Sequence, residues 1–262
     1  MRSLNISASG MLAQQLNIAV ISDNLSKLQV SAFKRQRLEF AEMAPQNLRT
    51  AGASTSGSGN VLPTGAQIGL GVKPVAISRI MLQGEMKPTG NPLDLGIEGK
   101  GYFRVELPNG GTAYTRAGSF QLSPNGALVT NEGYFLQPQI TVPPEAVEIS
   151  ISNTGEVMAK LANNPTPQSL GQLELTNFAN PAGLQALGDN LSQETAASGS
   201  PTAGAPGNPG FGMVKQGVLE SSNVDPVVEM TTMVECQRHY EMCAESVKAS
   251  SEMMATANRL RS

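Results

Sequence analysis

Hydrophobic residues recur at helical spacing at both ends of the chain. The N-terminal series has an interval of seven residues and comprises Leu4, Met11, Ile18 and Leu25. The C-terminal series has the same interval and comprises Met233, Tyr240, Val247 and Met254. Such spacing places a hydrophobic stripe along one face of a helix. The pattern predicts a helix over roughly residues 3–28 and a second one that starts at Asp225-Pro226, where an acid at the N-cap precedes proline at the first helical position.

The middle of the chain has the short apolar runs of β-strands instead. Turn sequences separate these runs, among them Asn109-Gly110 and Asn125-Gly126, and Asn-Gly between apolar runs is a strong hairpin signal. The predicted strands lie within residues 93–97, 101–107, 113–116, 119–122, 127–130, 134–140, 147–151, 156–159 and 172–178. We therefore predict an α+β fold, in which both chain ends form a discontinuous, coiled-coil-like helical domain around a central antiparallel β domain.

These changes of pattern divide the chain into parts. Residues 1–33 and 224–262 are predicted to form the helical domain, residues 34–75 an extended or linker segment, and residues 76–223 the β domain. Two stretches have the Gly-, Ser-, Pro- and Ala-rich composition of connectors, residues 51–60 and residues 198–212. We expect a flexible linker in the first stretch and a long loop in the second.

The predicted N-terminal helix carries no charged residue from Ser3 to Ser22. A helix with one face in water normally carries charges on that face. Uncharged side chains such as Gln14 and Leu16 can be buried without the cost of desolvating an ion. The pattern predicts contacts on more than one side of the helix, which one companion helix cannot supply, and so favours further copies of the chain or other proteins as partners. Ordinary packing against the β domain is the alternative.

Charge and hydropathy narrow the function classes. The formal net charge is −3, whereas nucleic-acid binders usually carry a basic face. No run approaches the roughly 20 apolar residues needed to span a bilayer. The N-terminal stretch also lacks the unbroken apolar core of a cleaved secretory signal. We expect a protein that binds no nucleic acid, does not span a membrane and, if exported, leaves the cytoplasm by a route without a cleaved signal.

Residues with catalytic or metal-binding potential form no convincing constellation. Cys236, His239 and Cys243 fall within about 60° on one helix face, but three ligands from one straight helix fit a tetrahedral metal poorly. Gly99-Lys100-Gly101 lacks the third glycine and the following helix of a dinucleotide-binding loop. A hydrolytic triad would have to use the chain's single histidine. We therefore predict no catalytic, cofactor or metal site and no enzymatic activity.

Several motifs, in order along nearly the whole chain, resemble the flagellar rod and hook proteins. The stretch at residues 93–103 reads Leu-Asp-Leu-Gly-Ile-Glu-Gly-Lys-Gly-Tyr-Phe and is similar to the β-domain motif of that family. The other matching stretches are residues 21–26, 32–35, 114–120, 126–130, 222–225 and 237–241. Within the family, the length and residues 62–72 are most similar to the members that build the distal rod.

This resemblance implies a structural, self-assembling subunit. In the family, both chain ends form a helical inner domain that packs against neighbouring subunits, and the β domain forms the outer layer. The expected product is a homo-oligomeric helical polymer in the basal body, a rigid tube that crosses the periplasm and transmits motor torque to the hook. The implied partners are copies of the chain, the proximal rod, the hook, the P- and L-ring bushing proteins and the flagellar type III export apparatus. A rod-type insertion at about residues 46–64 is implied to stiffen the shaft.

Two alternatives stay open, together with one departure from the family pattern. The chain could be a proximal rod or hook subunit of the same family or, in a different class, a monomeric β-rich glycan-binding module. Ala32 stands where the family usually has glycine. That substitution argues against a positive φ at this position, because a Cβ disfavours the left-handed region.

Overall fold

The computed structural model describes residues 2–49, 64–162 and 164–261. By its internal contacts the chain divides into two compact units. The helical unit consists of the residues up to 25, residues 36–78 and the residues from 225 onward. The β unit consists of residues 26–35 and 79–224.

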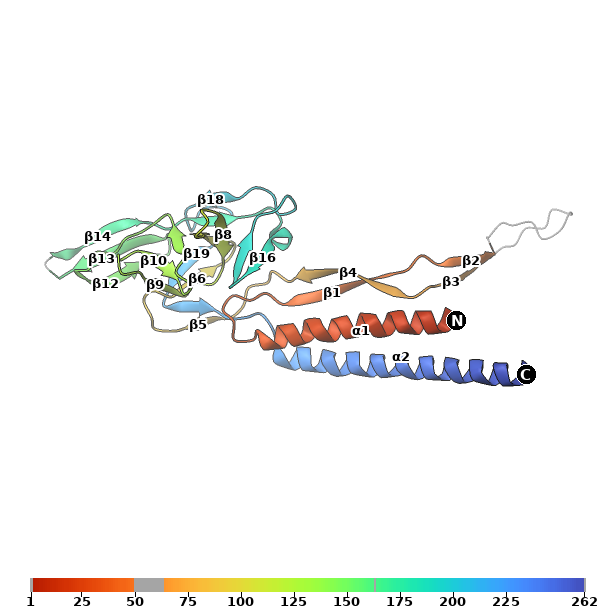
Figure 1. Ribbon diagram of the computed structural model, residues 1–262. Helices are drawn as coiled ribbons and strands as arrows, with labels where there is room; N and C mark the ends of the chain where they lie inside the picture. Colours follow the sequence, from red (N-terminus) through yellow and green to blue (C-terminus); the bar gives the residue numbers. More distant parts are fainter. Residues whose placement is uncertain (1, 50–63, 163, 262) are drawn as a thin grey trace. The chain divides into compact units, whose positions relative to one another are not determined.

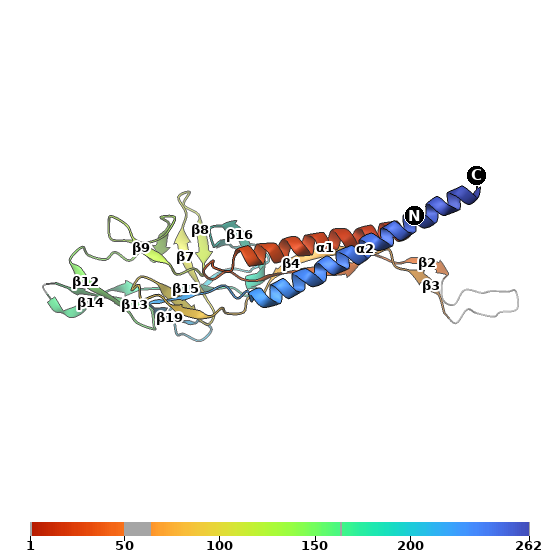
Figure 2. The same ribbon diagram turned by 90° about the horizontal axis from the view of Figure 1, so that it is seen from below.

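Two long helices dominate the helical unit. Helix α1 spans Arg2–Ser26 and helix α2 spans Pro226–Arg261, and the two run antiparallel and side by side (Figure 1, Figure 2). The carboxylate of Asp225 accepts a hydrogen bond from the backbone N–H of Val227 at 2.9 Å. This bond satisfies one of the donors that the first turn of a helix leaves without a partner. The predicted start of the C-terminal helix is thus confirmed.

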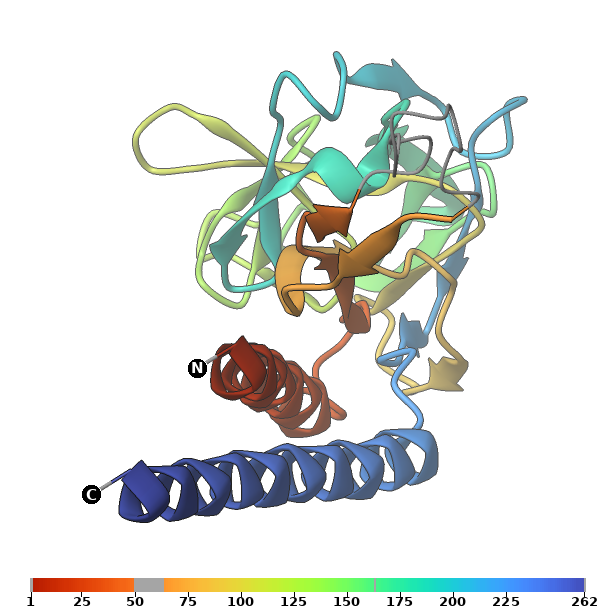
Figure 3. The same cartoon turned by 90° about the vertical axis from the view of Figure 1, so that its right-hand side faces the viewer.

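A narrow β-ribbon belongs to the same unit. Strands β1 (Gln36–Glu42) and β4 (Val72–Arg79) pair, and so do β2 (Gln46–Arg49) and β3 (Ala66–Ile68). Figure 3 shows α1 between α2 and this ribbon. The stretch predicted as an extended segment therefore contains paired strands. The linker predicted at residues 51–60 lies outside the described residues.

The β unit is built around a large sheet, within the described residues. Its main path runs in the order β16-β17-β8-β7-β11-β10-β9, and β15 pairs with β7 and with β18. The strand pairs are antiparallel. The strands are β7 (Tyr102–Glu106), β8 (Thr112–Thr115), β9 (Phe120–Leu122), β10 (Leu128–Thr130), β11 (Phe135–Gln137), β15 (Leu175–Asn177), β16 (Gln185–Gly188), β17 (Leu191–Gln193) and β18 (Thr202–Gly204).

Smaller antiparallel groups complete the unit. A three-stranded sheet has the order β12-β13-β14, and two strand pairs are β19 with β6 and β20 with β5. The elements are β5 (Met86–Pro88), β6 (Leu95–Glu98), β12 (Ala146–Ile151), β13 (Glu156–Leu161), β14 (Asn164–Gln172), β19 (Met213–Gln216), β20 (Val218–Glu220) and the 3-10 turn η1 (Pro181–Gly183).

The predicted α+β fold class is confirmed, and each predicted strand run overlaps a strand. The loop predicted over residues 198–212 is wrong in part. Residues Thr202–Gly204 form β18, which pairs with Leu175–Asn177 of β15. The composition of residues 198–212 does not indicate this strand. The strand forms because its backbone groups bond to β15, which lies elsewhere in the sequence.

The core of the β unit lies on the inner face of its sheets. Phe103 and Val105 alternate with exposed or half-buried neighbours along β7, as a strand with one buried face requires. The Phe103 ring meets Phe120 edge to face at a centroid distance of 5.1 Å, a favoured aromatic geometry. Both rings are fully buried, together with Leu95 and Ile97.

Ala32 adopts the left-handed region with φ 58°, so the argument against a positive φ at this position is wrong. Its backbone N–H donates to the carbonyl oxygen of Glu220 at 2.8 Å. An alanine in this region costs about 1–2 kcal/mol. The hydrogen bond to a strand distant in the sequence holds the backbone there despite the Cβ.

Candidate functional site

The two terminal helices contact each other in a regular heptad register. A Cβ placed on Gly10 would lie 3.1 Å from Cys243 Sγ, and the side chain of Asn17 donates to Cys236 Sγ at 3.0 Å. One further heptad along, Asn24 donates to Glu229 Oε2 at 3.1 Å. Each step of seven forward on α1 is a step of seven backward on α2. The helices are therefore an antiparallel pair, and these three contacts involve small and polar residues.

Asn24 connects the end of α1 with the first strand of the ribbon. It is 1% exposed, and its amide exchanges two hydrogen bonds with the backbone of Gln36 at 2.8 and 2.9 Å. The same amide nitrogen also reaches the buried carboxylate of Glu229 on α2. One side chain thus joins three elements of the helical unit.

The residues of the predicted hydrophobic stripes lie beside these contacts. Leu4, Met11, Ile18 and Leu25 on α1 are half-buried. On α2, Met233, Val247 and Met254 are half-buried as well, and Tyr240 is exposed. Each of these side chains therefore keeps accessible surface in a single copy of the chain.

Both helices also carry large apolar side chains that are mostly exposed to solvent. Leu12 on α1 is 67% exposed, and Val227 and Met230 on α2 are 70% and 62% exposed. Exposed apolar side chains in such number on neighbouring elements mark an interaction surface. On α1 the absence of charge from residue 3 to residue 22 removes the desolvation cost that would oppose such contact.

The ribbon approaches α1 closely at Gly71. This residue has φ 108°, and a Cβ there would lie 2.1 Å from Ser9 Oγ. The next backbone N–H, that of Val72, donates to the same hydroxyl at 3.3 Å. Only glycine fits this contact, which holds the ribbon to the charge-free stretch of α1.

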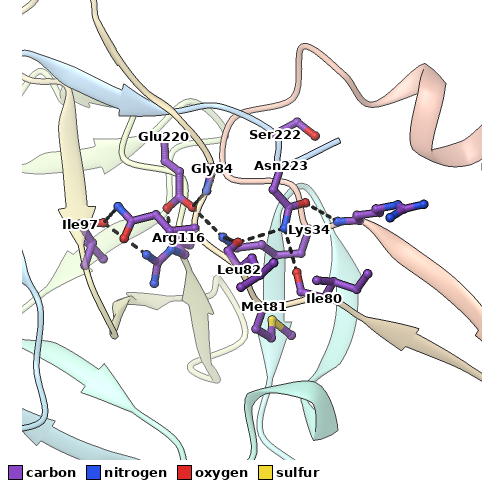
Figure 4. A network of polar contacts seen from close by, with 12 residues as sticks. Lys34, Ile80, Met81, Leu82, Gly84, Ile97, Arg116, Glu220, Ser222 and Asn223 are labelled. Carbon is purple, nitrogen blue, oxygen red and sulfur yellow. Dashed lines mark hydrogen bonds and ion pairs between the residues drawn. The ribbon is translucent and has the colours of Figure 1, made fainter. Parts of the chain in front are cut away.

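The β unit contains a buried cluster of three charged side chains (Figure 4). Glu220 at the end of β20 is 2% exposed. One carboxylate oxygen accepts from Lys34 Nζ at 2.6 Å, and the other accepts from Arg116 Nε at 2.6 Å. The first oxygen also accepts from the backbone N–H of Gly84 at 2.9 Å. A buried carboxylate is thus matched by two cations and a backbone donor.

The cluster shifts the protonation of its members. Burial would raise the pKa of Glu220, but the charges of Arg116 and Lys34 and the Gly84 hydrogen bond together hold that pKa below its usual value. Burial lowers the pKa of Lys34, an effect that the hydrogen bond and charge of Glu220 oppose and that Arg116 reinforces. The ionised carboxylate is therefore the partner that keeps both cations in place.

Asn223 extends this network of hydrogen bonds to neighbouring backbone of the same chain. Its carbonyl oxygen accepts from the backbone N–H of Arg35 at 2.7 Å. Its amide nitrogen donates to the carbonyl oxygens of Ile80 and Leu82, both at 2.9 Å. Lys34 Nζ donates to the Leu82 carbonyl as well, at 2.7 Å. Figure 4 shows these bonds converging on one small region.

The residues weighed for metal chemistry are spread over α2. Cys236 is buried, Cys243 is half-buried and His239 is exposed, and both cysteines are free thiols. Burial raises the pKa of the Cys236 thiol, and the hydrogen bond from Asn17 opposes this shift. Among the described residues, no three His, Cys, Asp or Glu side chains form a group that could hold a metal ion. Within the same residues, neither helix is long and apolar enough to cross a membrane.

Sequence reasoning did not single out the polar contact residues Asn24, Glu220 and Asn223. Asn24 and Asn223 lie in stretches that resemble family motifs, which do not indicate the contacts of either side chain. In the sequence, nothing marks a single uncharged or acidic side chain in a hydrophobic stripe or beside a strand as a residue that makes a polar contact. The partner that gives each of them a role comes from a distant part of the chain.

Two family models match the chain. The model described as the flagellar hook protein FlgE/F/G D1 domain matches residues 96–159, which lie in the β unit. The model described as the flagellar basal body rod FlgEFG protein C-terminal matches residues 215–260, which include most of α2.

Curated relatives match over the full length. The flagellar basal-body rod protein FlgG of Caulobacter vibrioides is 49% identical over 262 residues and covers 100% of both chains. The protein of the same name from Borreliella burgdorferi is 44% identical over 100% of this chain and 99% of its own. The flagellar basal-body rod protein FlgF of Caulobacter vibrioides is 29% identical over 97% of this chain and 96% of its own.

Proposed function

The chain belongs to the FlgG family of flagellar basal-body rod proteins, and we propose that its copies assemble into the distal rod through their terminal helices. It is a structural subunit of the flagellar basal body. The observation that carries the assembly proposal is the surface of α1, which is free of charge from residue 3 to residue 22 and exposes Leu12.

The comparisons favour the distal rod over the alternatives. Two proteins of one bacterium, its FlgG and its FlgF, are 49% and 29% identical to this chain. That difference separates the chain from another rod protein of the same family. Membership of a rod family over the full length likewise disfavours a monomeric glycan-binding module.

The proposed mechanism is packing rather than catalysis. Burial of an exposed leucine or methionine side chain contributes about 1.5–3 kcal/mol. Each copy offers several such side chains on α1 and α2, so repeated modest contacts can hold a polymer together. The half-buried stripe residues Leu4, Met11, Ile18 and Leu25, with Met233, Val247, Met254 and the exposed Tyr240, are proposed to contribute the rest of this contact surface. The product is a rigid helical tube that transmits motor torque to the hook.

The proposed partners follow from this role. Besides copies of the chain, they are the proximal rod below, the hook above, the P- and L-ring bushing proteins around the tube and the type III apparatus that exports the subunit without a cleaved signal. The tube would span the periplasm. Residues 46–64 are proposed to stiffen it. Of these, residues 50–63 lie outside the described residues, and residues 46–49 pair with residues 66–68.

A matched pair of substitutions tests the assembly surface. Leu12→Glu places a charge on α1 where the side chain is 67% exposed, and Val147→Glu places one on β12 where it is 72% exposed. Neither change removes a buried side chain, so both proteins should fold. We expect Leu12→Glu to be absent from purified basal bodies in electron micrographs with labelled protein, and Val147→Glu to be incorporated. Normal incorporation of Leu12→Glu would rule out this helix face as the assembly surface.

A second experiment addresses the stiffness of the shaft. Deletion of residues 46–64 removes β2 and the segment that follows it. We expect rods that still form but bend in electron micrographs. Rods of unchanged rigidity would contradict the role proposed for this insertion and leave the assembly surface unaffected.

A further inference from the structure

The charged cluster of the β unit joins stretches of chain that are far apart in sequence. Lys34 comes from the stretch after α1, Gly84 from the stretch before β5, Arg116 from the residue after β8, and Glu220 from β20. Arg116 also donates to the carbonyl oxygens of Ile97, Gly99 and Gly101 at 3.2, 2.6 and 3.1 Å. Arg116 is thus fixed by β6 and by the turn between β6 and β7, whereas Lys34 and Glu220 belong to stretches that lead toward the two chain ends.

The stretch at residues 32–35 depends on the C-terminal part of the β unit. Its backbone bonds run from Ala32 N–H to Glu220, from Arg35 N–H to the Asn223 side chain, and from Asn223 N–H to Phe33. Asn223 stands two residues before Asp225, the N-cap of α2. The same few side chains therefore fix the chain that leaves α1 and the chain that enters α2.

Electrostatics couples the three charged side chains, so that Lys34 stays buried only while the Glu220 carboxylate is in place. Lys34 and Arg116 are each only 10% exposed at the side chain. Without the carboxylate between them, two cations would be buried beside each other with no compensating charge. Leaving a buried charge uncompensated is far more costly than exposing it to water. Without the carboxylate, Lys34 therefore has to move out to solvent, and the backbone of residues 32–35 moves with it.

We propose that Lys34, Arg116 and Glu220 form a junction latch that orders the N-terminal connection only when residues 220–223 have joined the β unit. In other words, residues 32–35 become ordered only after residues 220–223 have packed into the β unit. Glu220 and Asn223 act as positioning residues. Glu220 holds the side chains of Lys34 and Arg116, Asn223 holds nearby backbone, and neither contacts another protein in this role. If the terminal helices assemble as proposed above, the latch ensures that both are presented together.

Hydrogen exchange on the unassembled full-length chain tests the latch directly. We expect Glu220→Gln to speed amide exchange at residues 32–35 by about a hundredfold or more, since a buried ion pair is broken. The amides of Phe103 and Val105 in the core should change far less. Glu98→Gln is the matched control, because Glu98 pairs with Lys215 at 2.8 Å on the surface, with side-chain exposures of 52% and 45%. Surface pairs contribute little, so its exchange should equal that of the parent.

A second variant separates charge from packing. Lys34→Met in the Glu220→Gln background removes the repulsion between the two cations. We expect exchange at residues 32–35 to be at least about tenfold slower in this double variant than in Glu220→Gln alone, a coupling typical of residues in one network. Additive effects of the two substitutions would overturn the latch. So would a loss of protection that is equal at residues 32–35 and in the core.

The test is independent of assembly. It is read on single chains, so a failed latch leaves the proposed role of the helices in the rod intact. Conversely, normal latch behaviour together with incorporation of Leu12→Glu would overturn only the assembly proposal.

Discussion

Gly10 of α1 faces Cys243 of α2, and a Cβ built on Gly10 lies 3.1 Å from Cys243 Sγ. A disulfide needs a separation of about 3 Å between one Cβ and the opposite sulfur, as its bond lengths and angles dictate. The native thiol is therefore already in position for a bond to a cysteine at residue 10. This contact fixes the register of the helix pair at one point.

The first prediction uses this geometry to test the antiparallel register. Gly10→Cys should form a disulfide with Cys243 under mild oxidation, without displacement of either helix. The bond would link residues distant in sequence and so change the mobility of the denatured chain in non-reducing electrophoresis.

Two controls make the result specific. Gly10→Cys combined with Cys243→Ser should show no shift within one chain, and Ser3→Cys should form far less of the bond because it lies two helical turns away from residue 10. Cross-linking that yields only dimers would contradict an intramolecular helix pair in this register.

The second prediction concerns the left-handed residue Ala32. Ala32→Gly removes the Cβ that strains φ 58°, while glycine adds entropy to the unfolded chain. Relief of about 1–2 kcal/mol against a cost of about 0.4–1 kcal/mol leaves a net gain. We expect the free energy of unfolding in urea to rise by up to about 1.6 kcal/mol. Ala203→Gly, in strand β18, is the control and should lower it. A lower stability for Ala32→Gly would mean that the strain is relieved elsewhere.

Local signals explain what could be predicted from the sequence. The start of α2 could be placed because Asp225 and Pro226 act within one helical turn. The hairpins could be placed because Asn125-Gly126 selects its turn without help from the rest of the chain. The heptad spacing of Met11 and Ile18 likewise reports helical structure directly. These elements depend on neighbours in sequence, and pattern is sufficient for them.

The remaining features depend on partners from distant parts of the chain. Ala32 is left-handed because Glu220 accepts its N–H, and no local pattern indicates that bond. The helices are also joined by a hydrogen bond between Asn17 and Cys236, which a hydrophobic pattern cannot identify. The same is true of β18, whose sequence has a connector's composition. Burial decides the role of such residues, and burial is a property of the folded chain.

The third prediction is that acid weakens the β unit through Glu220. Its pKa is held below the usual value, so the native state favours the ionised form more than the unfolded chain does. Such a group adds stability above its unfolded-state pKa, and that contribution is lost as the pH falls through the folded-state pKa. The loss should therefore appear below about pH 4.3. We expect the protection of the amides of residues 32–35 against hydrogen exchange to fall in that range.

Glu220→Gln provides the reference for this effect. The variant is less stable at neutral pH, but it lacks the titrating carboxyl, so the difference from the parent should narrow as the pH falls from 6 to 3. Glu98→Gln should follow the parent throughout, because its ion pair is exposed. A constant difference between the parent and Glu220→Gln across this range would exclude Glu220 as a source of the acid sensitivity.

The fourth prediction concerns Asn24, which joins α1, β1 and α2. Asn24→Leu keeps a similar volume but leaves the N–H and carbonyl of Gln36 without their side-chain partner, and it removes a donor to the buried carboxylate of Glu229. Each buried group left unsatisfied costs about 1–3 kcal/mol, so we expect a loss of about 3 kcal/mol in the free energy of unfolding of the helical unit. Faster exchange should appear first at the Gln36 amide. Asn5→Leu, at an exposed position of the same helix, should change the stability by less than about 0.5 kcal/mol. Equal effects of the two substitutions would show that the loss of stability reflects a change in helix propensity and not the loss of the buried amide.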